Sequence, residues 1–149
     1  MTDYAPLVPR LVSLAEADPE CEVCGFVATD ARGRPSVVPA RNVAGEGREA
    51  FLVDPAAHLA LARRLRAEGG RIAAVYHSHV DGPACLSPAD LEGALDEDAP
   101  LMPGVDQVVI GMRGGKAQEI KVFAWTGSGF AEVSALDGTL ARRVARGAR

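Results

Sequence analysis

The sequence predicts an α/β protein in which one mixed β-sheet is flanked by helices. Apolar residues recur at helical spacing over residues 6–17, and a second helical pattern begins at Asp54 and stops at Gly69. Several short runs rich in valine, isoleucine and phenylalanine indicate strands, among them the buried run at residues 72–76. Helices that alternate with such strands are packed most economically as layers on a sheet.

The remaining elements follow from turn signals and periodicity. Pro19 ends the first helix, and a turn at residues 32–35 separates two strands that would form a hairpin. The helix from Asp54 would connect a short strand at 51–53 to the strand at 72–76 as one crossover unit. A short helix is expected to begin at Ser87, and the other expected strands are 22–29, 36–43, 107–112, 119–125 and 130–133.

Length and composition narrow the class of protein. With 149 residues we expect a single domain, 1–149, whose tail from about residue 135 is helical or frayed. The formal net charge of -4 argues against nucleic-acid binding, and no apolar run reaches the roughly 20 residues of a membrane-spanning helix. The N-terminus does not resemble a signal peptide, and three cysteines do not suit a secreted disulfide scaffold. These features favour a cytoplasmic protein with no membrane or nucleic-acid partner.

The most informative stretch contains His77 and His79, one residue apart, followed by Ser87 and Asp90. Residues i and i+2 of a strand point to the same face, so the two imidazoles can converge. A turn at Gly82 would let the chain return and bring in Asp90 as a third donor. Catalytic zinc sites commonly use three such ligands and leave a fourth position for water. A helix start with Ser87 as N-cap requires no metal and is compatible with this interpretation.

The spacing of these four residues resembles the signature of the JAMM (JAB/MPN) zinc metalloproteases. Glu22, two residues before a Cys-Gly pair, fits the glutamate that this family carries there. The resemblance covers at least residues 19–90 and implies a JAB/MPN-like fold, a single curved sheet flanked by helices. It implies that His77, His79 and Asp90 bind one zinc ion, that Glu22 is the acid and base, and that Ser87 stabilises the tetrahedral intermediate.

The same resemblance implies a class of substrate. Enzymes of this family cleave an isopeptide or peptide bond after the C-terminal Gly-Gly of a ubiquitin-like protein, and small bacterial members process ubiquitin-like sulfur carriers or remove ubiquitin-like tags. The expected partners are therefore a ubiquitin-like or sulfur-carrier protein with a Gly-Gly terminus and the E1/E2-like enzymes of its pathway. Glycine suits this chemistry because it lets a backbone pass close to a metal site.

Three other interpretations remain open. Cys21 and Cys24 form a C-x-x-C that, with the two histidines, would make a closed structural zinc site, although the histidine spacing departs from that of zinc fingers. A non-catalytic MPN-type interaction module on the same fold predicts that ligands have been lost. A RadC-like protein associated with nucleic acid predicts a basic surface.

Two further side chains carry expectations of their own. Cys85 lies in the predicted metal loop, and because zinc favours thiolate it is a candidate for a regulatory fourth ligand. The alternative for Cys85 is a small apolar loop residue. His58 lies on the helix that begins at Asp54, has no evident partner, and is expected at the surface.

Overall fold

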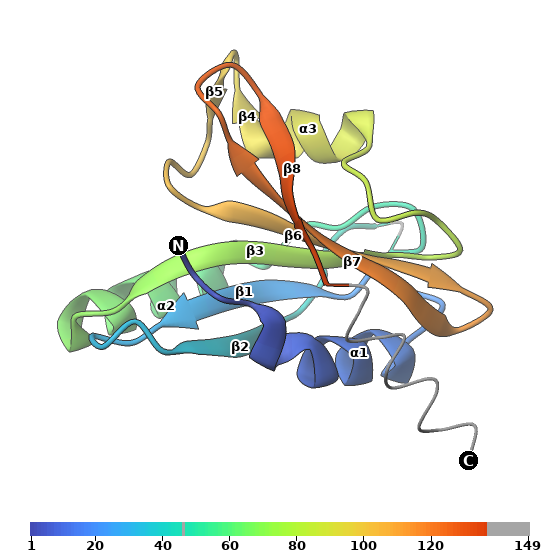
Figure 1. The fold of residues 1–149 in the computed structure, drawn as a ribbon, viewed down its shortest axis with the longest axis horizontal. Coiled ribbons are helices and arrows are strands. Elements are labelled where there is room, and N and C mark those ends of the chain that lie inside the picture. Colours follow the sequence, from blue (N-terminus) through green and yellow to red (C-terminus); the bar gives the residue numbers. More distant parts are fainter. Residues whose placement is uncertain (46, 137–149) are drawn as a thin grey trace.

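The computed structural model describes residues 1–45 and 47–136, which form a six-stranded mixed sheet with helices packed against it (Figure 1). The strand order is β2-β1-β3-β6-β7-β8; β3 and β6 run parallel, and the other neighbouring pairs are antiparallel. The strands are β1 (Cys24–Thr29), β2 (Pro35–Ala40), β3 (Arg71–His79), β6 (Asp106–Arg113), β7 (Lys116–Trp125) and β8 (Phe130–Ala135). The predicted fold class is confirmed, and the tail expected to be helical or frayed lies almost wholly outside the described residues.

The helices begin and end where local sequence signals place them. Asp54 accepts the backbone N–H of Ala56 and so caps α2 (Pro55–Glu68), which ends at Gly69 in the left-handed conformation. The other helices are a 3-10 turn (Ala5–Leu7), α1 (Val8–Ala17) and α3 (Pro88–Ala94). None of the described helices is long and apolar enough to cross a membrane.

Two sequence expectations about connectivity are wrong. Residues 51–53 do not form a strand, because this segment makes only a single bridge, between Asn42 and Val53. The parallel pair is not formed across α2 but by β3 and β6. Their connection contains α3 and a separate two-stranded hairpin of β4 (Leu95–Asp96) and β5 (Ala99–Pro100). The crossover therefore surrounds the loop that follows His79, and α2 leads only into β3.

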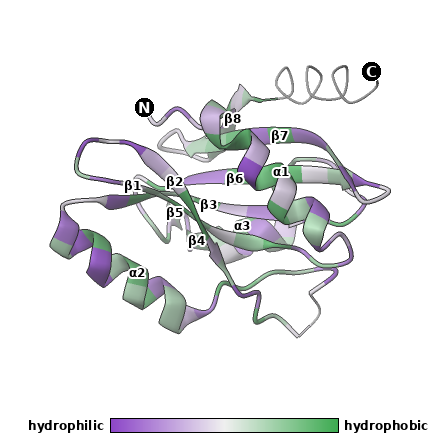
Figure 2. Ribbon diagram, turned by 90° about the horizontal axis from the view of Figure 1, so that it is seen from below, coloured by the Kyte–Doolittle hydropathy of each residue, from purple (hydrophilic) through white to green (hydrophobic). Residues whose placement is uncertain are grey.

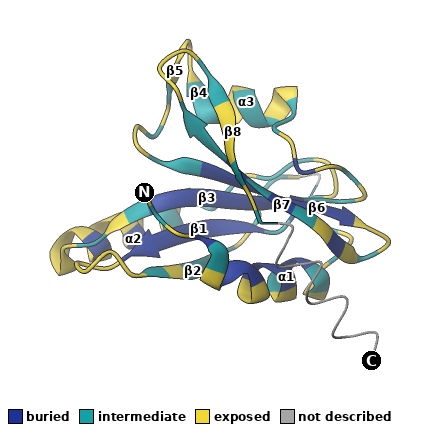
Figure 3. Cartoon of the chain, viewed as in Figure 1, coloured by how far each residue is buried: buried dark blue, intermediate teal, exposed yellow. Residues whose placement is uncertain are grey.

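The two faces of the sheet carry separate cores. On one face α1 packs against the strands, with Leu11, Ile110 and Ile120 fully buried. On the other face Phe26 and Val75 pack with residues of α2. Figure 2 shows apolar residues along α1 where it lies over the sheet, and Figure 3 shows β1 and β3 as buried while α3 and the β4–β5 hairpin are largely exposed. Val75 and Tyr76, neighbours on β3, thus belong to different cores.

The Cys-Gly pair that begins β1 has a packing reason. A Cβ atom at Gly25 would lie 2.5 Å from the Val38 carbonyl oxygen and 2.7 Å from the Tyr76 ring. No side chain fits there, so only glycine lets β1, β2 and the buried Tyr76 meet at this point. The glycine next to Cys24 therefore positions the end of β1 from which Glu22 extends.

Candidate active site

The two histidines lie at the C-terminal end of β3. His77 is fully buried, and the side chain of His79 is 12% exposed. Because strand residues alternate between faces, both imidazoles share the face on which Val75 packs, and Ser78 points to the opposite face. Their Nε2 atoms are 3.1 Å apart, so the convergence expected from the sequence is present.

Asp90 reaches the histidines because a reciprocal cap fixes the start of α3. Ser87 Oγ accepts the backbone N–H of Asp90 at 3.1 Å, and Asp90 Oδ2 accepts the backbone N–H of Ser87 at 2.9 Å. The same Oδ2 atom lies 3.1 Å from His77 Nε2 and 3.0 Å from His79 Nε2. The cap expected at Ser87 is confirmed, and it directs the carboxylate of Asp90 at both imidazoles.

The chemistry of these three donors fits a bound cation. His79 Nδ1 lies 2.7 Å from the carbonyl oxygen of Pro83, which can only accept, so Nδ1 carries the hydrogen and Nε2 of the neutral ring presents a lone pair. That lone pair faces the Asp90 carboxylate and His77 Nε2. With His79 neutral, these electron-rich atoms repel one another unless a positive charge lies between them. Metal bonds of about 2.0–2.1 Å give tetrahedral edges of about 3.3 Å, close to the observed separations.

Glu22 lies beside this group without belonging to it. It precedes β1, is 5% exposed, and its Oε1 is 4.0 Å from His79 Nε2. Burial raises the pKa of Glu22 to about 7, and the nearby Asp90 carboxylate adds to this increase. Among the described residues, Glu22 Oε2 and His77 Nδ1 are the buried side-chain atoms that lack a hydrogen-bond partner. A buried carboxylate with a free oxygen and a pKa near neutrality suits proton transfer.

The titration behaviour of His77 and Asp90 favours the forms that bind a metal, whereas that of His79 favours its protonated form until a cation displaces the proton. Burial lowers the pKa of His77, because its charged form would lose hydration. Burial would also lower the pKa of His79, but hydrogen bonds with Asp90 and Pro83 outweigh it and raise that pKa. Burial would raise the pKa of Asp90, yet hydrogen bonds with both histidines hold it far below its usual range. Neutral His77 and ionised Asp90 are the states that coordinate a cation.

A part of the sheet remote in sequence supports the loop between His79 and α3. Glu119 Oε1 accepts the backbone N–H of Ala84 at 2.7 Å. Gly111 makes this approach possible, because a Cβ atom there would lie 2.8 Å from Ala84 N and 2.9 Å from Glu119 Cγ. Pro83, whose carbonyl fixes the ring of His79, belongs to the same loop. Glu119 and Gly111 therefore act on the orientation of a candidate ligand through its outer partner.

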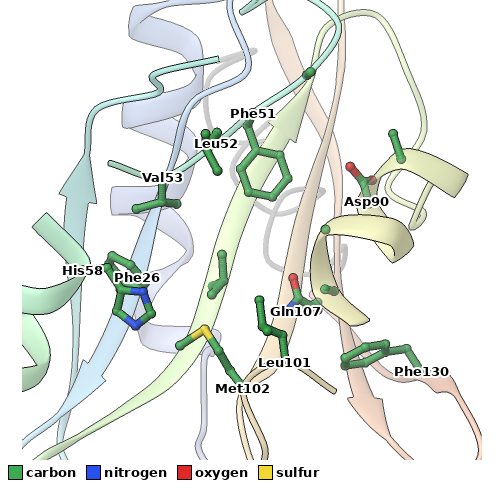
Figure 4. A pocket seen from close by; sticks show the side chains of 15 residues that line it. Phe26, Phe51, Leu52, Val53, His58, Asp90, Leu101, Met102, Gln107 and Phe130 are labelled. Carbon is green, nitrogen blue, oxygen red and sulfur yellow. The ribbon is translucent and has the colours of Figure 1, made fainter. Parts of the chain in front are cut away.

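An apolar groove opens next to the donors. The Phe51 ring stacks on His77, with centroids 4.2 Å apart and planes 16° from parallel, and covers one side of the donor group. Figure 4 shows Phe51 and Asp90 at the upper end of a cavity of about 230 Å³, and Leu101 and Met102 at its lower end. Its wall also includes Phe26, Leu52, Val53, His58, Val75, Gln107 and Phe130.

The groove corrects the expectation that His58 is a surface residue. Its ring lies 5.1 Å from the ring of Phe26, and it is half-buried in the wall of the groove. Phe51 was expected in a strand and not as a cover for a histidine. No local signal indicates either position, because the partner rings, Phe26 and His77, lie on strands distant in the sequence.

The cysteines do not join the donor group. Within the described residues, that group consists of the two histidines and the aspartate. Cys24 is buried, its thiol lies 3.9 Å from the Ala40 carbonyl oxygen, and burial raises its pKa to about 11, which disfavours the thiolate a metal needs. Cys21 is half-buried and Cys85 is exposed. The structure thus does not assemble a Cys₂His₂ site, and a regulatory role for Cys85 stays a prediction.

The fold and this donor set define the class of protein as a JAB-type domain with a candidate metal centre. Residues 4–126 match the family of prokaryotic homologs of the JAB domain, and the chain belongs to that family. Glu22, His77, His79, Ser87 and Asp90 all lie within the matched range.

Relatives with assigned names include an archaeal and a bacterial protein. The chain is 31% identical over 122 residues to the desampylase of Haloferax volcanii, covering 80% of this chain and 81% of that protein. It is 43% identical over 58 residues to a Thermus thermophilus protein named "Probable TtuB-protein conjugate cleaving protease", covering 39% of each.

Solved structures share the fold. Protein DSY2949 from Desulfitobacterium hafniense has a TM-score of 0.69 and 23% identity, covering 87% of this chain and 86% of that one. A protein from Salinibacter ruber has a TM-score of 0.57 and 27% identity, covering 87% and 85%. At 23% identity, the likeness to DSY2949 shows a shared fold and nothing more.

Proposed function

We propose that this chain is a zinc-dependent isopeptidase that cleaves after the C-terminal Gly-Gly of a ubiquitin-like or sulfur-carrier protein. The observation that carries the proposal is the group of His77, His79 and Asp90, with donor atoms 3.0–3.1 Å apart and the buried Glu22 carboxylate 4.0 Å from one of them. The names of the two relatives, a desampylase and a conjugate-cleaving protease, support removal of a ubiquitin-like modifier as the reaction.

In this proposal each residue has a definite task. His77, His79 and Asp90 hold zinc, which when bound lowers the pKa of a water ligand to about 7 and so supplies hydroxide at neutral pH. Glu22 takes a proton from the attacking water and gives it to the departing amine as the C–N bond breaks. Burial supports this role, because it raises the pKa of Glu22 above that of an exposed carboxyl and so makes it a better proton acceptor.

Ser87 has two tasks in the same scheme. Its oxygen accepts the Asp90 N–H, which fixes the direction of the carboxylate. Its hydroxyl hydrogen remains to donate to the oxyanion that develops on the substrate carbonyl, and loss of one such donor in other hydrolases costs about 3–4 kcal/mol.

The groove supports an extended, partly apolar peptide as the ligand. Aliphatic and aromatic side chains line it from Met102 to Phe51, and the donor group lies at its Phe51 end. A tail that filled the groove and ended in Gly-Gly would bring a narrow backbone, without side chains, to the donors. The three cysteines are free thiols, which supports the proposal of a reducing, cytoplasmic setting.

The experiment that tests the function combines metal content with cleavage. The purified chain is expected to carry one zinc per molecule and to release a carrier protein joined through a lysine side chain to the Gly-Gly end of a ubiquitin-like protein. His77→Ala and Asp90→Ala should lose both zinc and cleavage, whereas His58→Ala should keep zinc because it lies outside the donor group. Protein that cannot be loaded with a transition metal, or loaded protein that cleaves no Gly-Gly linkage, would contradict the proposal.

A further inference from the structure

Glu22 lies outside the strand that follows it, so the sheet ladder alone does not hold it. Strand β1 begins at Cys24, two residues later. Nevertheless, all four backbone polar groups of Glu22 and Val23 are paired. Glu22 N–H donates to the Gly47 carbonyl at 2.6 Å, and Val23 C=O accepts from the Ser78 backbone at 3.0 Å. The other two groups are paired with side chains, those of Asn42 and Ser78.

Ser78 connects Glu22 to the strand that carries both imidazoles. Its Oγ accepts the Val23 N–H at 2.9 Å, and Ser78 is 1% exposed. Cys24 pairs with His77, so Val23 lies opposite Ser78 and Glu22 comes opposite His79. Opposite residues of an antiparallel pair point to the same face, which brings the Glu22 carboxylate beside the His79 ring. The hydroxyl between the two histidines therefore fixes the register that places Glu22.

Asn42 holds the same segment from the other side. Its Nδ2 donates to the carbonyls of Glu22 at 2.9 Å and Ala50 at 3.0 Å. Its Oδ1 accepts the N–H groups of Ala44 and Leu52, each at 3.0 Å. Both amide hydrogens and the amide oxygen are thus used, and Asn42 is the one asparagine of the chain. The loop that it organises also contains Phe51, the residue stacked on His77.

We propose that the side chains of Asn42 and Ser78 form a clamp that positions Glu22 for proton transfer. This inference rests on the proposed function, because it gives Glu22 the role of acid and base. Asn42 and Ser78 bond to backbone groups of Glu22 and Val23 and act through them, so both are positioning residues. A carboxylate displaced by about 1 Å can lose about a hundredfold in rate, and a buried segment without a full ladder depends on such side chains for its place.

Three variants test the clamp, and two further variants serve as controls. Asn42→Asp keeps the acceptor for Ala44 and Leu52 but sets a carboxylate oxygen against two carbonyl oxygens. Ser78→Ala removes the acceptor for Val23, and Ser78→Thr restores a hydroxyl at that position. The matched controls are Gln118→Glu and Ser36→Ala, which make the same chemical changes at exposed positions of β7 and β2.

With zinc-loaded protein, Asn42→Asp and Ser78→Ala are expected to lower kcat about tenfold or more while KM and zinc affinity change less than about threefold. Ser78→Thr should recover most of the loss, and the controls should match wild type. In a Glu22→Gln background, Asn42→Asp should have little further effect on kcat, because both changes act through one group. Wild-type kcat in both clamp variants, or a fall in zinc affinity that matches the fall in kcat, would overturn the proposal.

Amide hydrogen exchange separates the clamp from the proposed function. Asn42→Asp and Ser78→Ala should speed exchange of the Glu22 and Val23 amides at least about tenfold and leave the centre of β6 unchanged. If wild-type protein cleaves no Gly-Gly linkage, the proposed function fails, and the exchange data still decide whether the clamp exists. Unchanged protection at those two amides would refute it even if the enzyme is active.

Discussion

The two faces of the sheet bury side chains of different chemistry, with different consequences for stability. On the α1 face most of the fully buried side chains are apolar, as with Leu11 and Ile120. On the α2 face the apolar cluster stops short of the C-terminal end of β3, where His77 is as buried as Leu11 and Glu22 is 5% exposed. Burial of apolar groups stabilises the fold, whereas burial of titratable groups lowers stability and shifts their pKa values. The candidate chemistry lies where one core is interrupted.

The largest effect on activity is expected from a substitution on the α2 face. Glu22→Gln should lower kcat by about 10²–10⁴-fold, the usual contribution of a general acid and base. Zinc content should stay at the wild-type level, because Glu22 is not among the converging donors. Steady-state kinetics and metal analysis on the same samples provide the measurement. Normal turnover would remove Glu22 from the mechanism, and loss of zinc would make it part of the metal site instead.

Substitutions on the α1 face should change the free energy of unfolding and leave kcat unchanged. Leu11→Ala leaves a cavity between α1 and the sheet and should lower the free energy of unfolding by about 2–5 kcal/mol. Leu59→Ala on α2 is the matched control, because Leu59 is 52% exposed and should change stability by less than about 0.5 kcal/mol. Urea unfolding measures both. A fall in kcat of folded Leu11→Ala protein would show that the two faces are not independent.

The pH dependence of stability should identify the cost of burying Glu22. In metal-free protein its folded pKa, about 7, is above the unfolded value, so its protonated form stabilises the fold below about pH 4.5 and this contribution is lost as pH rises through 7. Glu22→Gln lacks this loss and should gain about 1–3 kcal/mol over wild type between about pH 4 and pH 8. Unfolding of chelator-treated proteins across this range is the measurement. A difference that stays constant with pH would contradict the burial of an ionisable Glu22.

The smallest expected effect lies in the groove. Met102→Ala removes apolar surface from the end of the groove opposite Phe51 (Figure 4) and should raise KM about tenfold, which corresponds to about 1.4 kcal/mol, with kcat nearly unchanged. Val133→Ala, on an exposed strand position outside the groove, serves as the control. Equal effects of the two substitutions would show that the groove does not bind the substrate.

More of the candidate site than of the fold could be predicted from local sequence. The His77 and His79 pair converges through strand alternation, and the Ser87 cap is encoded within four residues, so both followed from short-range rules. Glu22 followed only from a family resemblance, since its place depends on the register of β1 against β3. Asn42 gave a weak signal as a lone asparagine before a glycine-rich loop. Glu119 gave none, because its partner Ala84 is 35 residues away.

The fold errors have a common physical cause. The helices and hairpins were predictable because caps, turns and alternation act within a few residues. The parallel partner of β3 was not, because pairing with β6 is decided by packing between segments about 30 residues apart. The run Phe51–Val53 looks like a strand by composition, yet Phe51 packs on a histidine ring and only Val53 forms a bridge.

Helix α3 contributes no buried residue, and its reciprocal cap uses Asp90, the same side chain that faces the two imidazoles. Ala89, Gly93 and Ala94 of this helix line the groove. If His77, His79 and Asp90 hold the proposed zinc ion, a chelator that removes it would also remove a constraint on α3 and so on one wall of the groove. Loss of metal and loss of substrate affinity would then appear together, because both depend on the first turn of α3.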